Sequence, residues 1–428
     1  MTAELARPAP TLPAMPNETE LRLRRLERLR GLDSRLRTAS ELIPPARRAA
    51  PESRLASGRA ERLAAAIGGR VIRTGEGAVV VVEQRTWLPF DPAPLGTLPY
   101  PIEAGRPLVL LDTETTGLGS GTGTMVFLVG VGVWLDQELV VTQLWLPDQA
   151  AEPAFLSALA DLVPADAWLV TYNGRTFDWP LLTTRYRLDR RPAPPIAGHL
   201  DLLTVARQLF RHRLPDARLA SVEAGIAGVR RPGDLPGALI PGRYFEWLRS
   251  GYAACLRDVL DHNHQDVVSL GQLLVVIAER LATPGGRPRA HPEDLASLGR
   301  AYRRRGQHEE ALRCMDAALA LPDPERSTSK GSFDRGRAWL DQGSLFAATG
   351  RSQEAIEAWQ QACRCGGRTA VRAWIALAKH HEHRARDVPQ ALLAAEQAAT
   401  LVARGRAFGR FDAWAERDLG RRLRRLRR

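Results

Sequence analysis

Three short acidic motifs in a fixed order place the strongest restriction on how this chain can fold. They read LLDTETTG at residues 110–117, VTYNGRTFD at 170–178 and HNHQDV at 262–267. Their four carboxylates, Asp112, Glu114, Asp178 and Asp266, come from three separate segments. Because like charges repel strongly at close range, a fold rarely gathers such a set unless a cation sits among it. Divalent metals take oxygen ligands, and phosphate esters are their commonest substrates in enzymes.

Composition limits the classes of protein to which the chain can belong. Its 428 residues suffice for two or three domains. The absence of a long apolar run and of a secretory signal favours a cytoplasmic protein with no membrane partner. The net charge of +12 attracts anions. Since Lys330 and Lys379 are the only lysines, a general bias toward arginine explains this charge equally well.

The first 60 residues form an N-terminal arm in which disorder precedes a basic helix. Residues 21–37, LRLRRLERLRGLDSRLR, place leucines at helical spacing among arginines. This helix either contacts nucleic acid or packs one leucine stripe with its other face in solvent. A β-hairpin is predicted at residues 68–90, where a Gly-Glu-Gly turn joins two apolar runs.

The pattern at residues 107–281 predicts an α/β domain, which together with the hairpin occupies residues 61–285. Three strands joined by short turns predict an antiparallel meander, with the first acidic pair at the end of its first strand. Helices at about 152–162 and after Asp178 then alternate with short strands near 167–170 and 200. A long helix is expected from Leu202. Such alternation predicts a mixed sheet with flanking helices.

A linker at residues 284–288 precedes a wholly helical region at 291–428. Small and aromatic residues recur there at the spacing of a tetratricopeptide repeat. Gly299 and Gly343, 44 positions apart, mark two copies separated by an insertion near residues 322–333. A weaker third copy and a basic C-terminal helix follow.

The spacing of the acids suggests one shared site. Asp112 and Glu114 lie at i and i+2 of a strand, so their side chains point to the same face. His262 precedes Asp266 by one helical turn, whereas His264 points away. Two metal ions sharing Asp112 would clamp a phosphodiester, with His262 taking or orienting the proton of the attacking water. Taken singly, each acid also fits a purely structural role, such as a helix N-cap for Asp178.

Neighbouring residues are weaker candidates. The predicted substrate-binding residues are Thr113, Tyr172, Asn173 and Phe177. Tyr172 and Phe177 either stack on a terminal base or pack in the core. Asp201 fits a helix N-cap better than a ligand role. A run of arginines at residues 207–218 fits a phosphate-tracking groove and a solvated helix face equally well.

The three motifs resemble those of the DEDD exonuclease superfamily, and most closely its YprB-like branch. The resemblance implies a ribonuclease H-like fold followed by tetratricopeptide-like repeats. It implies two Mg²⁺ or Mn²⁺ ions held by Asp112, Glu114, Asp178 and Asp266. One departure concerns the base, because His262 stands at the spacing where one DEDD class has tyrosine. Asp261 stands at the spacing where the other class has histidine.

The leading hypothesis is a metal-dependent 3′→5′ exonuclease acting on single-stranded DNA or RNA. Its catalytic residues are Asp112, Glu114, Asp178, His262 and Asp266, and the helical repeats recruit a protein partner. One alternative is an adaptor without catalytic activity that works through its repeats. Another is an endonuclease of the ribonuclease H type, which shares the metals but cuts internally.

Overall fold

The computed structural model describes residues 53–428 apart from 101, 104, 118–120, 283, 324–332 and 410–411. The predicted basic helix at residues 21–37 and most of the predicted insertion near 322–333 lie outside this range. Within it, no helix combines the length and apolarity needed to cross a bilayer.

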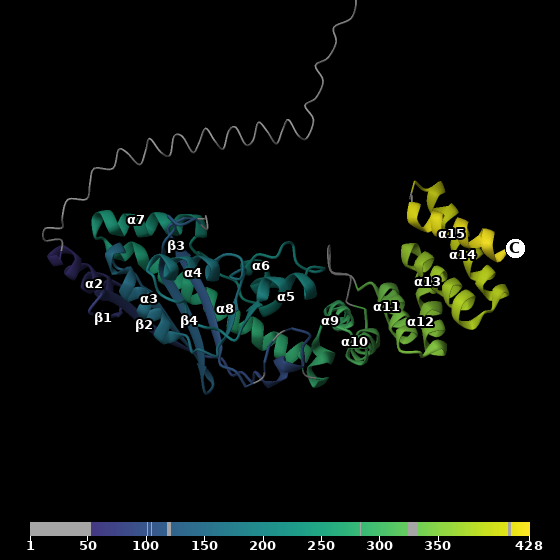
Figure 1. The fold of residues 1–428 in the computed structure, drawn as a ribbon, viewed down its shortest axis with the longest axis horizontal. Helices are drawn as coiled ribbons and strands as arrows, with labels where there is room; N and C mark the ends of the chain where they lie inside the picture. The colour runs from purple at the N-terminus through teal and green to yellow at the C-terminus, as the bar shows by residue number, and fades with distance from the viewer. Residues whose placement is uncertain are drawn as a thin grey trace, which may run out of the picture. The chain divides into compact units, whose positions relative to one another are not determined.

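One mixed sheet of seven strands organises the first part of the described chain, in the order β1-β2-β5-β4-β3-β6-β7 (Figure 1). Its strands are β1 (Arg70–Thr74), β2 (Gly77–Trp87), β3 (Leu108–Thr115), β4 (Val126–Leu135), β5 (Glu138–Trp145), β6 (Trp168–Thr171) and β7 (Gly198–Asp201). The β1–β2 hairpin and the β3–β4–β5 meander pair antiparallel, whereas β6 and β7 add in parallel beyond β3. The predicted mixed sheet is confirmed.

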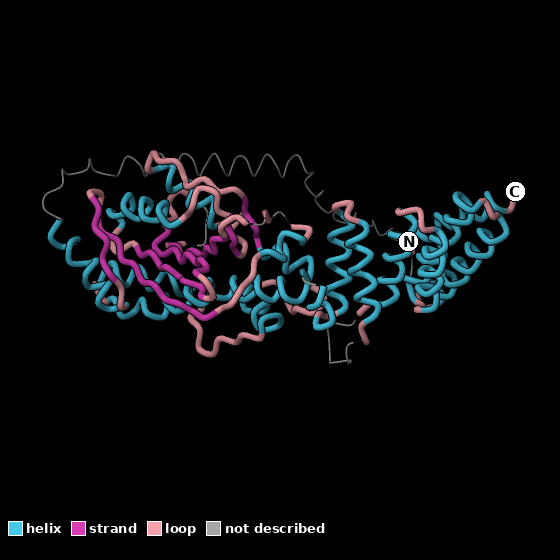
Figure 2. Tube along the Cα trace, turned by 90° about the horizontal axis from the view of Figure 1, so that it is seen from below, coloured by secondary structure: helices cyan, strands magenta, loops and turns pink. Residues whose placement is uncertain are grey.

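Helices cover both faces of this sheet (Figures 1 and 2). They are α2 (Ser53–Ile67), α3 (Glu152–Leu162), α4 (Asp178–Leu188), α5 (Leu202–Leu209), α6 (Leu219–Val222), α7 (Ile240–Ser250) and α8 (Arg257–Ile277). Strand alternation divides the core in two. On β3, Leu110 packs with residues of α5 and α8, whereas Val109 and Leu111 pack with residues of α3, α4 and α7.

Two glycines of β4 bring α8 close to the sheet. Gly130 pairs with Asp112 and Gly132 pairs with Leu110, both beneath α8. A Cβ atom at Gly130 would lie 2.5 Å from Oδ1 of Asn263, and one at Gly132 would lie 2.7 Å from Val267. Real Cβ atoms do not approach so closely, so only glycine lets α8 sit at this depth.

The second part of the described chain is helical, as predicted. Its α-helices are α9 (Pro292–Arg304), α10 (His308–Ala320), α11 (Arg335–Ala348), α12 (Ser352–Arg364), α13 (Gly367–His380), α14 (Val388–Ala407) and α15 (Ala413–Leu426). Helices that follow one another in sequence also pack against each other, and short turns join several of them, such as the one at Gly306 between α9 and α10. Their identity as tetratricopeptide repeats stays a prediction.

One local prediction is wrong. The long helix expected from Leu202 ends at Leu209, because the chain then turns so that Leu214 is buried in the core. The segment at residues 284–288, expected as a linker, lies within a 3-10 helix, Pro284–Arg289, between α8 and α9.

Candidate metal-dependent active site

Asp112 and Glu114 leave β3 on the face that α8 covers. Both are partly exposed, while the intervening Thr113 is buried on the opposite face. This alternation matches the predicted common orientation of the two acids. The parallel β3–β6 pair ends at the same sheet edge, which brings the segment after β6 toward these acids.

Asp178 reaches the site from the first residue of α4. It is 6% exposed, and the Thr113 hydroxyl donates a hydrogen bond to its Oδ1. Phe177 occupies the N-cap position, and no side chain caps the helix. Asp178 is therefore not an N-cap. Burial, opposed by the hydrogen bond from Thr113, raises its pKa to about 6.

Helix α8 supplies His262 and Asp266 on one face. Nε2 of His262 lies 3.5 Å from Oδ2 of Asp266 and 4.0 Å from Oε1 of Glu114. One potential ligand atom from each of these three residues lies within 4.8 Å of the others. The structure thus brings His262 to the acids, as the one-turn spacing predicts, whereas Asp261 is exposed.

The carboxylates interact strongly with one another. The pKa of Asp112 is raised well above its usual value by burial and by the charges of Asp266, Glu114 and Asp178. The pKa of Glu114 is raised in the same way by burial and by Asp266 and Asp178. Since each acid disfavours ionisation of the others, the set carries negative charge that a cation would stabilise.

Asp234 orients His262 from the loop before α7. Its Oδ1 lies 2.8 Å from Nδ1 of His262. Burial opposes ionisation of Asp234, but this hydrogen bond and the charges of His262 and Arg231 lower its pKa overall. A carboxylate at Nδ1 favours the tautomer with its proton there, which leaves the lone pair of Nε2 directed at Glu114 and Asp266.

Arg231 compensates part of the negative charge. Its guanidinium contacts the carboxylates of Asp266, Glu223 and Asp234. Glu223 is 1% exposed, and burial raises its pKa despite this partner. Arg231 therefore holds one of the predicted metal ligands in an ion pair.

A buried amide relay fixes Asp112. Nδ2 of Asn263 donates to Oδ2 of Asp112 at 2.9 Å, and Oδ1 of Asn263 accepts from Nε2 of Gln143 at 3.0 Å. The amide of Gln143 also donates to the carbonyl of Leu260 at 2.8 Å. Sequence analysis missed both amides and Arg231. The available signal for Asn263 was a polar residue on the buried face of α8, within the third motif.

The predicted substrate-binding residues occupy different settings. The Thr113 hydroxyl is engaged with Asp178, and the Tyr172 hydroxyl donates to the carbonyl of Ala217 at 2.6 Å. Asn173 is exposed in a left-handed conformation with φ of 67°. Phe177 is partly exposed beside Asp178 in the sequence.

Asp201 shapes the loop that carries Asn173. It is the N-cap of α5, as predicted, and accepts from the amide of Leu203 at 3.0 Å. The same carboxylate accepts from the amide of Asn173 at 2.8 Å. Asp201 therefore links the β6–α4 loop to the start of α5.

The raised pKa of Asp178 predicts a pH-dependent stability. An acid whose pKa rises from 3.8 to about 6 on folding binds more protons in the native state between these values. Its contribution to the free energy of unfolding is thus greatest below pH 4 and falls by about 3 kcal/mol as the pH rises to 7. We expect the stability of the wild type relative to Asp178→Asn to fall accordingly in urea unfolding with chelator. A difference that stays constant or rises with pH contradicts the shift.

The geometry can be compared with known proteins. Residues 109–278 match the family RNase_H_2, described as RNase_H superfamily. The chain is 34% identical over 293 residues to the protein YprB of Bacillus subtilis (strain 168), and this match covers 68% of each chain.

Two solved structures of exonuclease I show a weak likeness. One, described as apo, has a TM-score of 0.24 and 11% identity, covering 70% of this chain and 99% of its own. The other also has a TM-score of 0.24, with 12% identity, and covers 69% and 97%. A likeness this weak does not bear on function. The sequence match does show the family, and the chain belongs to the YprB family with a domain of the ribonuclease H superfamily.

Proposed function

We propose that this protein is a metal-dependent nuclease, and more specifically a 3′→5′ exonuclease on single-stranded nucleic acid. One observation supports it above all others. Asp112, Glu114, Asp178 and Asp266 lie close enough that the pKa of Asp112 is raised by all three of the others. A cluster of acids at this density is typical of a site for divalent cations.

The donor set fits Mg²⁺ or Mn²⁺. Carboxylate oxygens are the ligands that these hard cations prefer, and Asp112, Glu114, Asp178 and Asp266 would hold two of them. Two bound ions would supply an activated water and stabilise the leaving oxygen of a phosphodiester. Arg231 pairs with Oδ1 of Asp266, so Oδ2, which faces His262, is the oxygen that would bind an ion.

Side chains of the protein perform the remaining tasks. Nε2 of His262 is directed at Glu114 and Asp266, where it can accept a proton from an attacking water. Asp234 holds the required tautomer of His262. Asn263 and Thr113 orient Asp112 and Asp178, so that the two acids keep fixed directions before substrate arrives.

Single-strand preference is proposed from the residues at the mouth of the site. Asn173 and Phe177 belong to the β6–α4 loop directly before Asp178, and both are accessible. An aromatic ring at this place can stack on a terminal base, and an amide can bond its phosphate or sugar. The 3′→5′ polarity and a cytoplasmic site rest on the resemblance to DEDD exonucleases and on the sequence.

An adaptor without catalytic activity is the second candidate. It is favoured by Arg231, whose guanidinium already neutralises Asp266 and so competes with a cation for that ligand. In this reading the helical region, α9 to α15, binds a protein partner and the acid cluster is structural.

A panel of end-labelled substrates tests the proposal. DNA and RNA strands labelled at either end are incubated with the full-length protein, with Mg²⁺, Mn²⁺ or chelator. We expect metal-dependent release of mononucleotides from the 3′ end. Internal products would identify an endonuclease instead. No cleavage of any strand with either metal would support the adaptor.

A further inference from the structure

A basic cavity lies between the sheet domain and the helical region. A cavity of about 280 Å³ lies between the β6–α4 loop, the start of α5 and the end of α9. Its polar lining includes Tyr100, Arg175, Asp201, Gln208, Arg304 and Arg305. Residues from both parts of the described chain therefore face one space.

Arginines outnumber acids in the lining of this cavity. Among the described residues, no acid forms an ion pair with Arg175, Arg304 or Arg305. Nη2 of Arg175 donates to the carbonyl of His199 at 2.9 Å, and Nη2 of Arg304 lies 3.4 Å from Oε1 of Gln208. The one carboxylate in the lining, Asp201, already accepts backbone amides. Three arginines around a small space favour an anion.

A buried hydroxyl lacks a partner in the same lining. The Tyr100 hydroxyl is inaccessible to solvent and finds no hydrogen-bond partner among the described residues. A buried hydroxyl without a partner costs about 1–3 kcal/mol. A rotation of the Tyr100 side chain that brings its hydroxyl to a ligand acceptor in the cavity would therefore be favourable. Burial raises the pKa of this phenol, so the hydroxyl keeps its proton and remains a donor.

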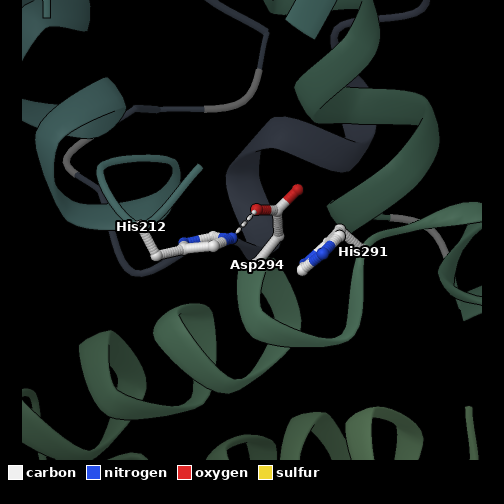
Figure 3. A group of neighbouring side chains, drawn as sticks. All are labelled: His212, His291 and Asp294. Carbon is white, nitrogen blue, oxygen red and sulfur yellow. Dashed lines mark ion pairs between the residues drawn. The ribbon is translucent and has the colours of Figure 1, made fainter. Parts of the chain in front are cut away.

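Fixed contacts hold the two walls of the cavity together. Nη2 of Arg213 lies 2.6 Å from Oδ2 of Asp294 on α9, and Nε2 of His212 lies 3.2 Å from Oδ1 (Figure 3). The Tyr302 hydroxyl of α9 donates to the carbonyl of Thr97 at 2.8 Å. These contacts fix the backbone at the end of α9, from which the exposed side chains of Arg304 and Arg305 extend.

The group of His212, His291 and Asp294 is better explained as part of the contact between the sheet domain and α9 than as a metal site. One potential ligand atom from each lies within 4.8 Å of the others. However, Arg213 donates to both oxygens of Asp294, and Nδ1 of His291 accepts the amide of Glu293 at 3.2 Å. A cation there would have to displace these donors and stand beside a guanidinium.

We propose that this cavity binds a phosphate group of a nucleic-acid strand whose end lies among the four acids. Arg175 stands three positions before Asp178, so the loop that supplies Arg175 to the cavity leads directly into the acid at the start of α4. Arginine forks suit phosphate oxygens, and the Tyr100 hydroxyl adds a further donor. The first helix of the helical region thus belongs to the substrate path. This inference deepens the proposed function, and its test measures binding without cleavage.

The test uses the double variant Arg304→Gln/Arg305→Gln in the full chain. A fluorescent 12-nucleotide DNA or RNA strand is titrated with chelator present, so that no hydrolysis is required. We expect the Kd to rise about tenfold. The slope of log Kd against the logarithm of the salt concentration should fall by about one. The matched control is Arg417→Gln/Arg421→Gln, which removes the same charge from exposed, unpaired positions of α15 in the described structure. The control should change Kd less than twofold.

Two further arms complete the design. Tyr100→Phe should weaken strand binding about threefold without lowering Tm, because it removes a donor that has no partner in the protein. Competition with inorganic phosphate and with a mononucleotide shows which molecule supplies the phosphate group that the cavity binds. If the mononucleotide competes with the strand for the wild type but not for the double variant, the cavity binds a free phosphomonoester. Strand and mononucleotide affinities that are equal in wild type, double variant and control overturn the inference, even if the protein cleaves nucleic acid.

Discussion

Asp112→Asn is expected to reduce metal-dependent hydrolysis by about 10³-fold or more, which corresponds to about 4 kcal/mol of transition-state stabilisation. The charges of all three other carboxylates raise the pKa of Asp112, so its carboxyl group lies within electrostatic reach of each of them. Asparagine has nearly the same shape but brings one neutral oxygen where a bridging carboxylate is needed. The measurement is the initial rate of nucleotide release from an end-labelled strand in Mn²⁺.

The amide substitution also separates chemistry from folding. It removes a charge that the other acids repel, so the metal-free variant should be at least as stable as the wild type. Asp261→Asn is the matched control, because Asp261 is exposed on α8 one position before His262. Its rate should stay within twofold of the wild type. An Asp112→Asn protein that folds and retains the wild-type rate would contradict the assignment of the site.

Arg231→Gln is expected to lower the free energy of unfolding of the metal-free protein by about 3–5 kcal/mol at pH 7.5. The substitution leaves Glu223, which is 1% exposed, as a buried charge without its cationic partner. It also leaves Asp266 among like charges. The measurement is urea unfolding followed by tryptophan fluorescence in the presence of chelator.

Two comparisons identify the cause of this loss. Adding Glu223→Gln removes the stranded charge, so the double variant should recover most of the lost stability. Arg85→Gln is the control, because Arg85 pairs with Glu83 and Glu138 through exposed side chains, and such pairs contribute about 0–1 kcal/mol. If Arg231→Gln lowers the free energy of unfolding no more than Arg85→Gln does, Arg231 does not stabilise the buried charge of Glu223.

Local patterns were sufficient to predict most of the sheet. The helix at residues 152–162 has the predicted bounds, and the β3–β4–β5 meander follows from apolar runs divided by short turns. The face shared by Asp112 and Glu114 follows from strand periodicity, and that shared by His262 and Asp266 from the helical repeat. Each of these predictions depends on residues that are near in sequence.

Contacts between distant segments were not predictable in this way. Arg231 lies 35 positions before Asp266, and Gln143 lies 120 positions before Asn263. No periodicity relates such pairs, because tertiary packing alone brings them together. The end of α5 was missed for the same reason, since burial of Leu214 overrides the helical pattern that continues beyond Leu209.

Because Gly130 and Gly132 carry no Cβ atom, α8 packs directly on β4, and this contact sets the distance across the acid site. With hydrogen as the side chain at Gly130 and Gly132, Asn263 and Val267 rest almost on the backbone of the strand. Asp266 stands on the same helix, so its separation from Asp112 is inherited from this contact. A side chain of any size at these two positions would act as a spacer, widening the gap between the carboxylates without touching any of them.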